Sequence, residues 1–157
     1  MAEPRKYAEG TDVSVARSRA ELEALLQKHG ATSVGILRDD SGVLVVFEMK
    51  GRRIKQTIVN PDPEDFKLTP GIERRRTAEQ VRAAMDNELR RRWRALMLIL
   101  KAKLELVASG GSSFEVEFLA STMLPNGDTV ADAMLPRIEQ AYKTNTMPPL
   151  MLGGGRG

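Results

Sequence analysis

The sequence contains no cysteine, a single histidine and few aromatic residues. Without cysteine the chain cannot form a disulfide, a thiolate metal site or a cysteine nucleophile, and such a composition is typical of a reducing compartment. The lone histidine, His29, leaves no second imidazole for a metal site and only one candidate base for a serine triad. Aromatic residues make up 4% of the chain, so aliphatic side chains and eight methionines have to fill the core.

Long apolar segments and phosphate-binding loops are also missing. The longest apolar run, residues 95–100, is far shorter than the ~20 residues that span a bilayer, so we expect no membrane association. The segment from Met1 to Lys6 lacks the apolar core of a signal peptide. The glycines at 110–111 and 153–155 lack the spacing and the lysine of a phosphate loop.

The 157 residues fit one domain, and the order of the predicted elements indicates an α+β fold. We expect a polar arm over residues 1–10, a single domain over 11–146 and an extended tail over 147–157. The domain is predicted to contain an N-terminal helix, a three-stranded antiparallel meander, a long basic amphipathic helix and two short C-terminal helices.

The stretch 77–108 is predicted to be one long helix around which the rest is organised. Thr77 and Gln80 form a capping box at its start, and the Ser-Gly-Gly sequence at 109–111 ends it. The helix is apolar on all sides at 95–100, so we expect burial there on more than one side. One stripe recurs at intervals of four and three residues: Val81, Met85, Leu89, Trp93, Leu96, Leu100, Leu104 and Val107.

The N-terminal region is predicted to combine a strand and a helix. Residues 11–16 alternate valine with polar residues, which favours a short strand. Ser18 and Glu21 then have the spacing of a second capping box, and Gly30 is placed to end the helix just after His29.

The meander is predicted over residues 32–38, 43–49 and 52–59. Turn residues at 39–42 and the Lys50-Gly51 pair separate the strands. In the third strand Ile54 and Ile58 point to one face, which we expect to pack on the long helix. Arg53, Lys55 and Thr57 point to the other face, which therefore carries positive charge.

The connection 60–76 begins with prolines that end the sheet, and a short turn is expected at 64–66. After the long helix, Ser112 and Glu115 form a third capping box for a helix reaching about Met123. A last helix over 129–142 is expected to be kinked or restarted at Pro136.

Positive charge is concentrated in one segment. From Arg74 to Lys103 there are ten basic and three acidic residues, a net of +7, whereas the whole chain is +3. Clustered cations bind a phosphate backbone. The predicted binding surface combines Lys50, Arg52, Arg53 and Lys55 of the hairpin, Arg74, Arg75 and Arg76 of the connection, and Arg90, Arg94 and Lys101 of the helix.

Each of these features also has a plainer interpretation. The basic side chains can be solvated faces that cover apolar surface with their stems. Asp62, Glu64 and Asp65 lie close enough to hold Mg²⁺, but acids here also suit a turn and a first helical turn. Trp93 can stack on a base or fill the core, and its place in the apolar stripe favours the core. We therefore predict no metal, no cofactor and no enzymatic activity.

Several blocks together resemble a family of small uncharacterised proteins from bacteriophage and prophage genomes. They are Lys6-Tyr7-Ala8-Glu9-Gly10-Thr11, Phe47-Glu48-Met49-Lys50-Gly51-Arg52-Arg53-Ile54, Trp93-Arg94-Ala95-Leu96, Lys101-Ala102-Lys103-Leu104-Glu105, Phe118-Leu119-Ala120 and Leu124-Pro125-Asn126-Gly127. The resemblance spans most of the chain and implies a protein of the bacterial cytoplasm, but it implies no particular activity.

The order of elements is also similar to the core of phage single-strand annealing proteins, in which a meander precedes a long helix. Those proteins assemble as rings or filaments and hold single-stranded DNA between hairpin and helix. This similarity implies an oligomer that binds single-stranded nucleic acid, DNA rather than RNA, in replication or recombination.

An alternative is a non-enzymatic phage module that binds a host protein through the long helix and the methionine-rich tail. A third interpretation is a protein that sequesters a small anion in a pocket.

Overall fold

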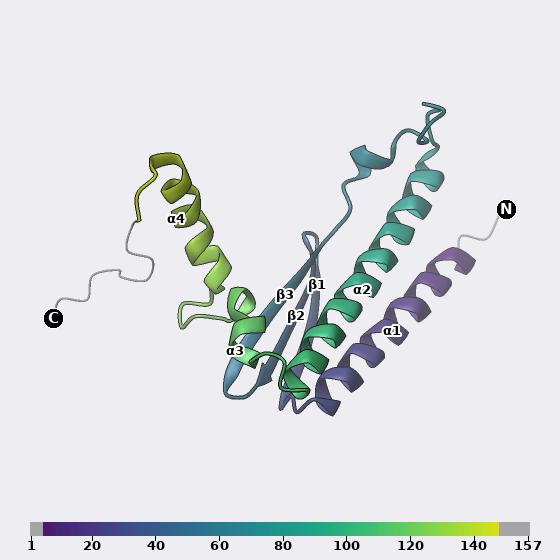
Figure 1. Ribbon diagram of the computed structural model, residues 1–157. Helices are drawn as coiled ribbons and strands as arrows, with labels where there is room; N and C mark the ends of the chain where they lie inside the picture. Colours follow the sequence, from purple (N-terminus) through teal and green to yellow (C-terminus); the bar gives the residue numbers. More distant parts are fainter. Residues whose placement is uncertain (1–4, 148–157) are drawn as a thin grey trace.

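The computed structural model describes residues 5–147, with side chains from residue 16 onward. It has the expected α+β architecture, with one sheet, a long helix and shorter helices near the C-terminus (Figure 1). The elements run in the order α1 (Arg5–Lys28), β1 (Ser33–Asp39), β2 (Gly42–Met49), β3 (Arg52–Val59), η1 (Pro63–Phe66), α2 (Ala78–Ala108), α3 (Phe114–Glu117), η2 (Leu119–Ser121) and α4 (Val130–Thr144).

Helix α1 is longer than the sequence predicts. It covers residues 11–16, so the predicted strand there is wrong, and Ser18 lies inside the helix rather than at its cap. It also includes residues 5–10 of the segment expected to be an arm. The predicted end is confirmed, because Gly30 has φ of +99° and the Ala31 amide donates to the carbonyl of Leu26 at 3.0 Å.

The three strands form an antiparallel sheet in the order β1-β2-β3, as predicted. At the β2–β3 turn Lys50 and Gly51 both have positive φ, 50° and 71°, which matches the twist of a two-residue hairpin. At the β1–β2 turn the Asp39 carboxylate accepts hydrogen bonds from the amides of Ser41 (2.8 Å) and Gly42 (3.1 Å). Local turn chemistry therefore sets the register of both hairpins.

Helices α1 and α2 cover one face of the sheet (Figure 1). Ile54 and Ile58 are buried on this face, as predicted, while Arg53 and Thr57 are exposed and Lys55 is half-buried on the other. Burial of such aliphatic side chains stabilises the fold by roughly 2 kcal/mol each. The core between the helices and the sheet contains Leu22, Leu26, Ile36, Val43, Val45, Phe47, Met49, Leu89, Trp93, Leu96, Leu100 and Leu104.

Helix α2 begins at the predicted capping box. The Gln80 amide donates to the Thr77 hydroxyl at 3.2 Å, and the Thr77 amide donates to the Gln80 side chain at 2.9 Å. Trp93 is 2% exposed and its core role is confirmed. The expectation that residues 95–100 are buried on more than one side is wrong within this chain, because Leu98 is 62% and Ile99 51% exposed.

The segment after α2 is more broken than predicted. Helix α3 has four residues and is capped by Ser113 instead of Ser112, and the chain then turns through η2 and does not stay helical to Met123. An isolated antiparallel bridge joins Thr122 to Ile54, and the Met123 amide donates to the Arg53 carbonyl at 2.8 Å. This segment thus covers part of the free edge of β3.

Helix α4 is continuous through Pro136, so of the two predicted outcomes, a kink or a restart, the restart is wrong. It begins at a capping box in which the Asp132 amide donates to the Thr129 hydroxyl at 3.1 Å. It projects away from the sheet and the two long helices (Figure 1). The predicted tail continues from Met147 into residues 148–157, which lie outside the described part of the chain.

Candidate nucleic-acid interface

The structure divides the ten predicted binding residues among three places. The β2–β3 hairpin carries Lys50, Arg52, Arg53 and Lys55 at one end of the molecule, and residues 74–76 precede α2 at the opposite end (Figure 1). Arg90, Arg94 and Lys101 lie between these ends, along α2. The single continuous surface that the sequence suggests is therefore not formed within one copy.

The hairpin cations lie near acidic side chains. Arg52 Nη2 is 3.8 Å from Oε1 of Glu115, and Arg53 is paired with Glu48 in the sheet register. The pKa of Asp132 is lowered, mainly by its hydrogen bonds with Thr129 and to a smaller extent by Lys55. Because acidic side chains lie beside Arg52, Arg53 and Lys55, the hairpin is a weak site for a phosphate backbone.

The three arginines before α2 belong to a compact loop. An antiparallel bridge joins Leu68 to Arg75, and Arg76 donates from its amide to the Lys67 carbonyl at 2.8 Å and from Nη1 to the Phe66 carbonyl at 3.3 Å. Arg76 is thus part of the loop's own structure, while Arg74 and Arg75 are exposed.

The predicted helix cations lie on the side of α2 that meets α1. Arg90 and Arg94 line a hollow of about 230 Å³ between the helices, together with Arg17, Ser18, Glu21 and Met97. Arg90 is half-buried and donates from Nη1 to the Asn87 side chain at 3.2 Å, while Arg94 and Lys101 are exposed. At intervals of four and seven residues, the three share one side of the helix, as predicted.

Arg17 was not among the predicted site residues. It lies across the hollow from the α2 arginines, and its Nε is 3.2 Å from Oε1 of Glu21. The sequence signal that would have found it is the helical spacing of Arg17 and Glu21, which the predicted helix start at Ser18 concealed. We call Arg17, Arg90, Arg94 and Lys101 the α1–α2 basic patch.

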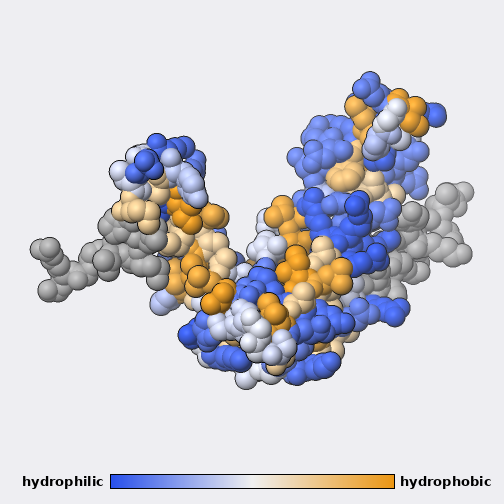
Figure 2. Space-filling model, in the orientation of Figure 1, coloured by the Kyte–Doolittle hydropathy of each residue, from blue (hydrophilic) through white to orange (hydrophobic). Residues whose placement is uncertain are grey.

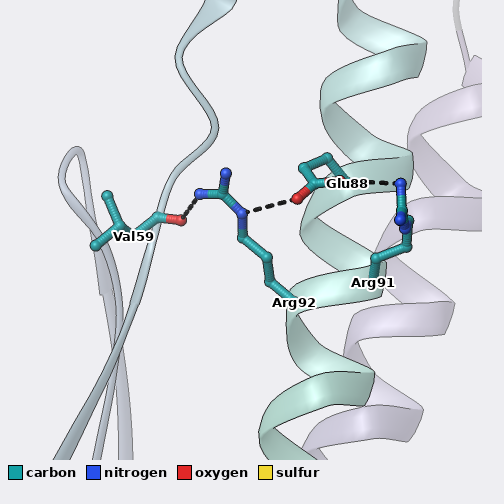
Figure 3. Close-up of polar contacts among 4 residues, drawn as sticks. All are labelled: Val59, Glu88, Arg91 and Arg92. Atoms are coloured by element: carbon teal, nitrogen blue, oxygen red, sulfur yellow. Dashed lines mark hydrogen bonds and ion pairs between the residues drawn. The ribbon is translucent and has the colours of Figure 1, made fainter.

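Other cations of α2 hold the fold together. Arg92 reaches from the helix to the end of β3, and both Arg91 and Arg92 lie within 3.4 Å of Glu88 (Figure 3). Lys103 donates to the Glu117 carbonyl at 2.7 Å, and its Nζ lies 5.4 Å from the centre of the Phe118 ring. Of the ten cations in this segment, several thus make structural contacts and only Arg90, Arg94 and Lys101 belong to the patch.

The remaining titratable candidates have structural positions. The Asp62 carboxylate accepts from the Glu64 amide at 3.0 Å and caps η1, and His29 is half-buried just after α1. Among the side chains described, residues 16–147, no group of three histidine, aspartate or glutamate side chains is arranged to hold a metal ion. None of the helices over residues 5–147 combines the length and apolarity required to cross a membrane.

Comparison with known proteins adds no functional assignment. A scan against protein-family models found no match, and searches of curated proteins and of solved structures found none either. The function therefore has to be argued from the geometry of the patch.

Proposed function

We propose that the protein binds single-stranded nucleic acid, DNA in preference to RNA, through the phosphate backbone. The observation that carries this proposal is the hollow between α1 and α2, where three of the six described lining residues are arginines and one, Glu21, is acidic. Arg94 and Lys101 extend the cationic surface along exposed positions of α2. Neutralising phosphates releases counterions, which supplies affinity without sequence preference.

The preference for a single strand follows from the order of elements, which resembles the core of phage annealing proteins. Trp93 is buried, so in this proposal bases do not stack on it. In this proposal the protein acts in replication or recombination inside the bacterial cell. Several copies assembled as an oligomer would supply the length of basic surface that one copy does not.

Charge reversal on the patch tests the proposal. Arg94→Glu and Lys101→Glu each remove a backbone contact, and we expect either change to lower the affinity for a labelled oligothymidine about tenfold and to reduce the salt slope by about 1. Arg38→Glu is the matched control, because Arg38 is exposed on β1 and lies outside the patch. Equal affinities for the wild type and both patch variants would contradict the proposal.

A second candidate is binding of an acidic segment of a host protein. The small size of the patch, four cations in place of the ten predicted, favours it, since a short acidic peptide needs fewer contacts than a nucleic-acid strand. A pull-down with and without nuclease distinguishes the two: partners that persist after nuclease treatment would support the protein-binding function.

A further inference from the structure

Helix α4 is a strongly amphipathic helix whose apolar stripe is only partly covered by the described residues. Over its 15 residues it has no buried side chain, and its packing within the chain is mainly against the short η2 turn. Figure 1 shows it extending away from the sheet and from α1 and α2. A helix with one apolar stripe is stable when that stripe is covered.

The apolar stripe of α4 is wide. At 3.6 residues per turn its members fall within about 140° of the helix circumference, compared with the ~100° minimum for a stripe that faces one core. Leu135 is 61%, Ile138 39% and Tyr142 87% exposed. The stripe consists of Val130, Ala131, Met134, Leu135, Ile138, Ala141 and Tyr142.

A second exposed apolar area lies on the body of the molecule. It covers the outer side of the C-terminal half of α2 and the adjoining α3 and η2. Figure 2 shows apolar residues along α4 and on the body of the molecule, with an open gap between α4 and the rest of the molecule. The exposed members are Leu98 (62%), Ile99 (51%), Leu106 (44%), Val116 (68%) and Leu119 (57%).

We infer that α4 of a second copy of the chain packs against these two apolar areas. In a two-fold arrangement each α4 packs against its symmetry mate on one side of its stripe and against the partner's α2–α3 area on the other. The stripe is wide enough to contact both the symmetry-related α4 and the partner's α2–α3 area. In such a dimer the α4 stripe and the α2–α3 area of both copies are covered.

The exposed area matches what a stable dimer buries. Eight large apolar side chains, each more than a third exposed, amount to roughly the 800 Å² per partner of a standard interface.

The charge of α4 also favours its own copy as the partner. It has two acidic residues, Asp132 and Glu139, and two basic residues, Arg137 and Lys143, so its charged groups sum to zero. Two identical surfaces can meet only where they do not repel each other. The hollow lined by Arg17, Arg90 and Arg94, in contrast, lies between α1 and α2.

The dimer does not depend on nucleic-acid binding, but it would strengthen it. Two patches in one particle convert the second contact with a strand into an intramolecular event, which raises the overall affinity. The two proposals can fail separately, because self-association is measured in the absence of nucleic acid.

Sedimentation equilibrium of the full chain in about 1 M salt, after nuclease treatment, tests the inference, because charge contacts are screened there to about 3 Å. We expect a mass of twice the 17.4 kDa chain for the wild type and a single chain mass for Ile138→Glu, with an unchanged far-UV spectrum. Gln140→Glu, on the polar side of α4, is the control and should remain dimeric. A monomeric wild type, or a dimeric Ile138→Glu, would overturn the inference.

A cross-linking experiment uses the absence of native cysteine. Ile138 lies at the middle of the stripe, close to the proposed two-fold axis, so Ile138→Cys should form a disulfide-linked dimer under mild oxidation. Gln140→Cys should remain largely monomeric on a denaturing gel. Equal cross-linking of the two variants would rule out the proposed packing of α4 against α4.

Discussion

Arg92 of α2 donates a 2.7 Å hydrogen bond from Nη1 to the carbonyl oxygen of Val59, the last residue of β3. Its Nε also lies 3.1 Å from Oε1 of Glu88, one helical turn earlier (Figure 3). A cation that the sequence groups with its basic neighbours thus ties the end of the sheet to the helix. Arg94, two residues further on, faces α1 and remains exposed.

Replacing Arg92 should therefore affect stability more than binding. Arg92→Ala removes a charge-assisted hydrogen bond to a strand carbonyl, and we expect it to lower the free energy of unfolding by about 1 kcal/mol in urea denaturation. Arg91→Ala is the control: Arg91 shares Glu88 but is 79% exposed, so its loss should cost roughly 0–0.5 kcal/mol. Similar losses for the two variants would contradict the structural role of Arg92.

The parts of the fold that the sequence predicts correctly depend on local chemistry. The capping box of Thr77 and Gln80, the Lys50-Gly51 turn and the alternation of Ile54 and Ile58 each act within a few residues. Helix α1 was mispredicted because the valines at 13 and 15 favour a strand locally, and such propensity is a weak prior.

The candidate site was harder to predict because it depends on contacts between distant segments. Glu115 returns beside Arg52 from more than sixty positions away in the sequence, and no local pattern indicates this. Arg90 and Arg92 are two residues apart but lie on different sides of α2. Sequence spacing predicted the shared side of Arg90 and Arg94 but not which element covers that side.

Trp93, the only tryptophan, gives a direct optical test of the core. Because it is 2% exposed, its fluorescence in the folded protein should be blue-shifted and should move to longer wavelength in urea. Saturating oligothymidine should leave its intensity nearly unchanged. Strong quenching on binding would show that the indole contacts bases and that the described burial does not persist in the complex.

Gly42 is required by the close approach of β2 and β3. A Cβ at this position would lie 2.0 Å from the carbonyl oxygen of Ile58, a backbone atom that cannot move independently of the sheet. We expect Gly42→Ala to destabilise the protein by more than about 2 kcal/mol in urea denaturation.

Gly35 on β1 provides the control for this substitution. Its added Cβ would meet the Val46 carbonyl oxygen at an ordinary 3.9 Å, so Gly35→Ala should change the free energy of unfolding by less than about 0.5 kcal/mol. A stable Gly42→Ala variant would show that the pairing of β2 and β3 is looser than described.

Asp39 should make the β1–β2 turn sensitive to acid. Its pKa is lowered by hydrogen bonds from the Ser41 hydroxyl and from the amides of Ser41 and Gly42. A carboxylate with a lowered folded-state pKa contributes stability that is complete above its ordinary value of about 3.9 and is lost as pH falls through the lower folded value.

The urea midpoint should consequently fall more steeply below about pH 4 for the wild type than for Asp39→Asn, because the asparagine side chain does not titrate. Two-dimensional NMR of the Asp39 carboxyl resonance gives an independent reading, with a titration below the ordinary aspartate range. Parallel pH profiles for the two proteins, with an ordinary titration of Asp39, would contradict the hydrogen-bonded turn.

The most direct test of nucleic-acid binding is the anisotropy of a labelled oligothymidine titrated with the full chain between about 50 and 200 mM salt. With four cations in the α1–α2 basic patch, we predict that, for a strand bound to one patch, the logarithm of the association constant falls against the logarithm of salt concentration with a slope near −3. Absence of binding at the lowest salt, or a slope near zero, would contradict the proposed function.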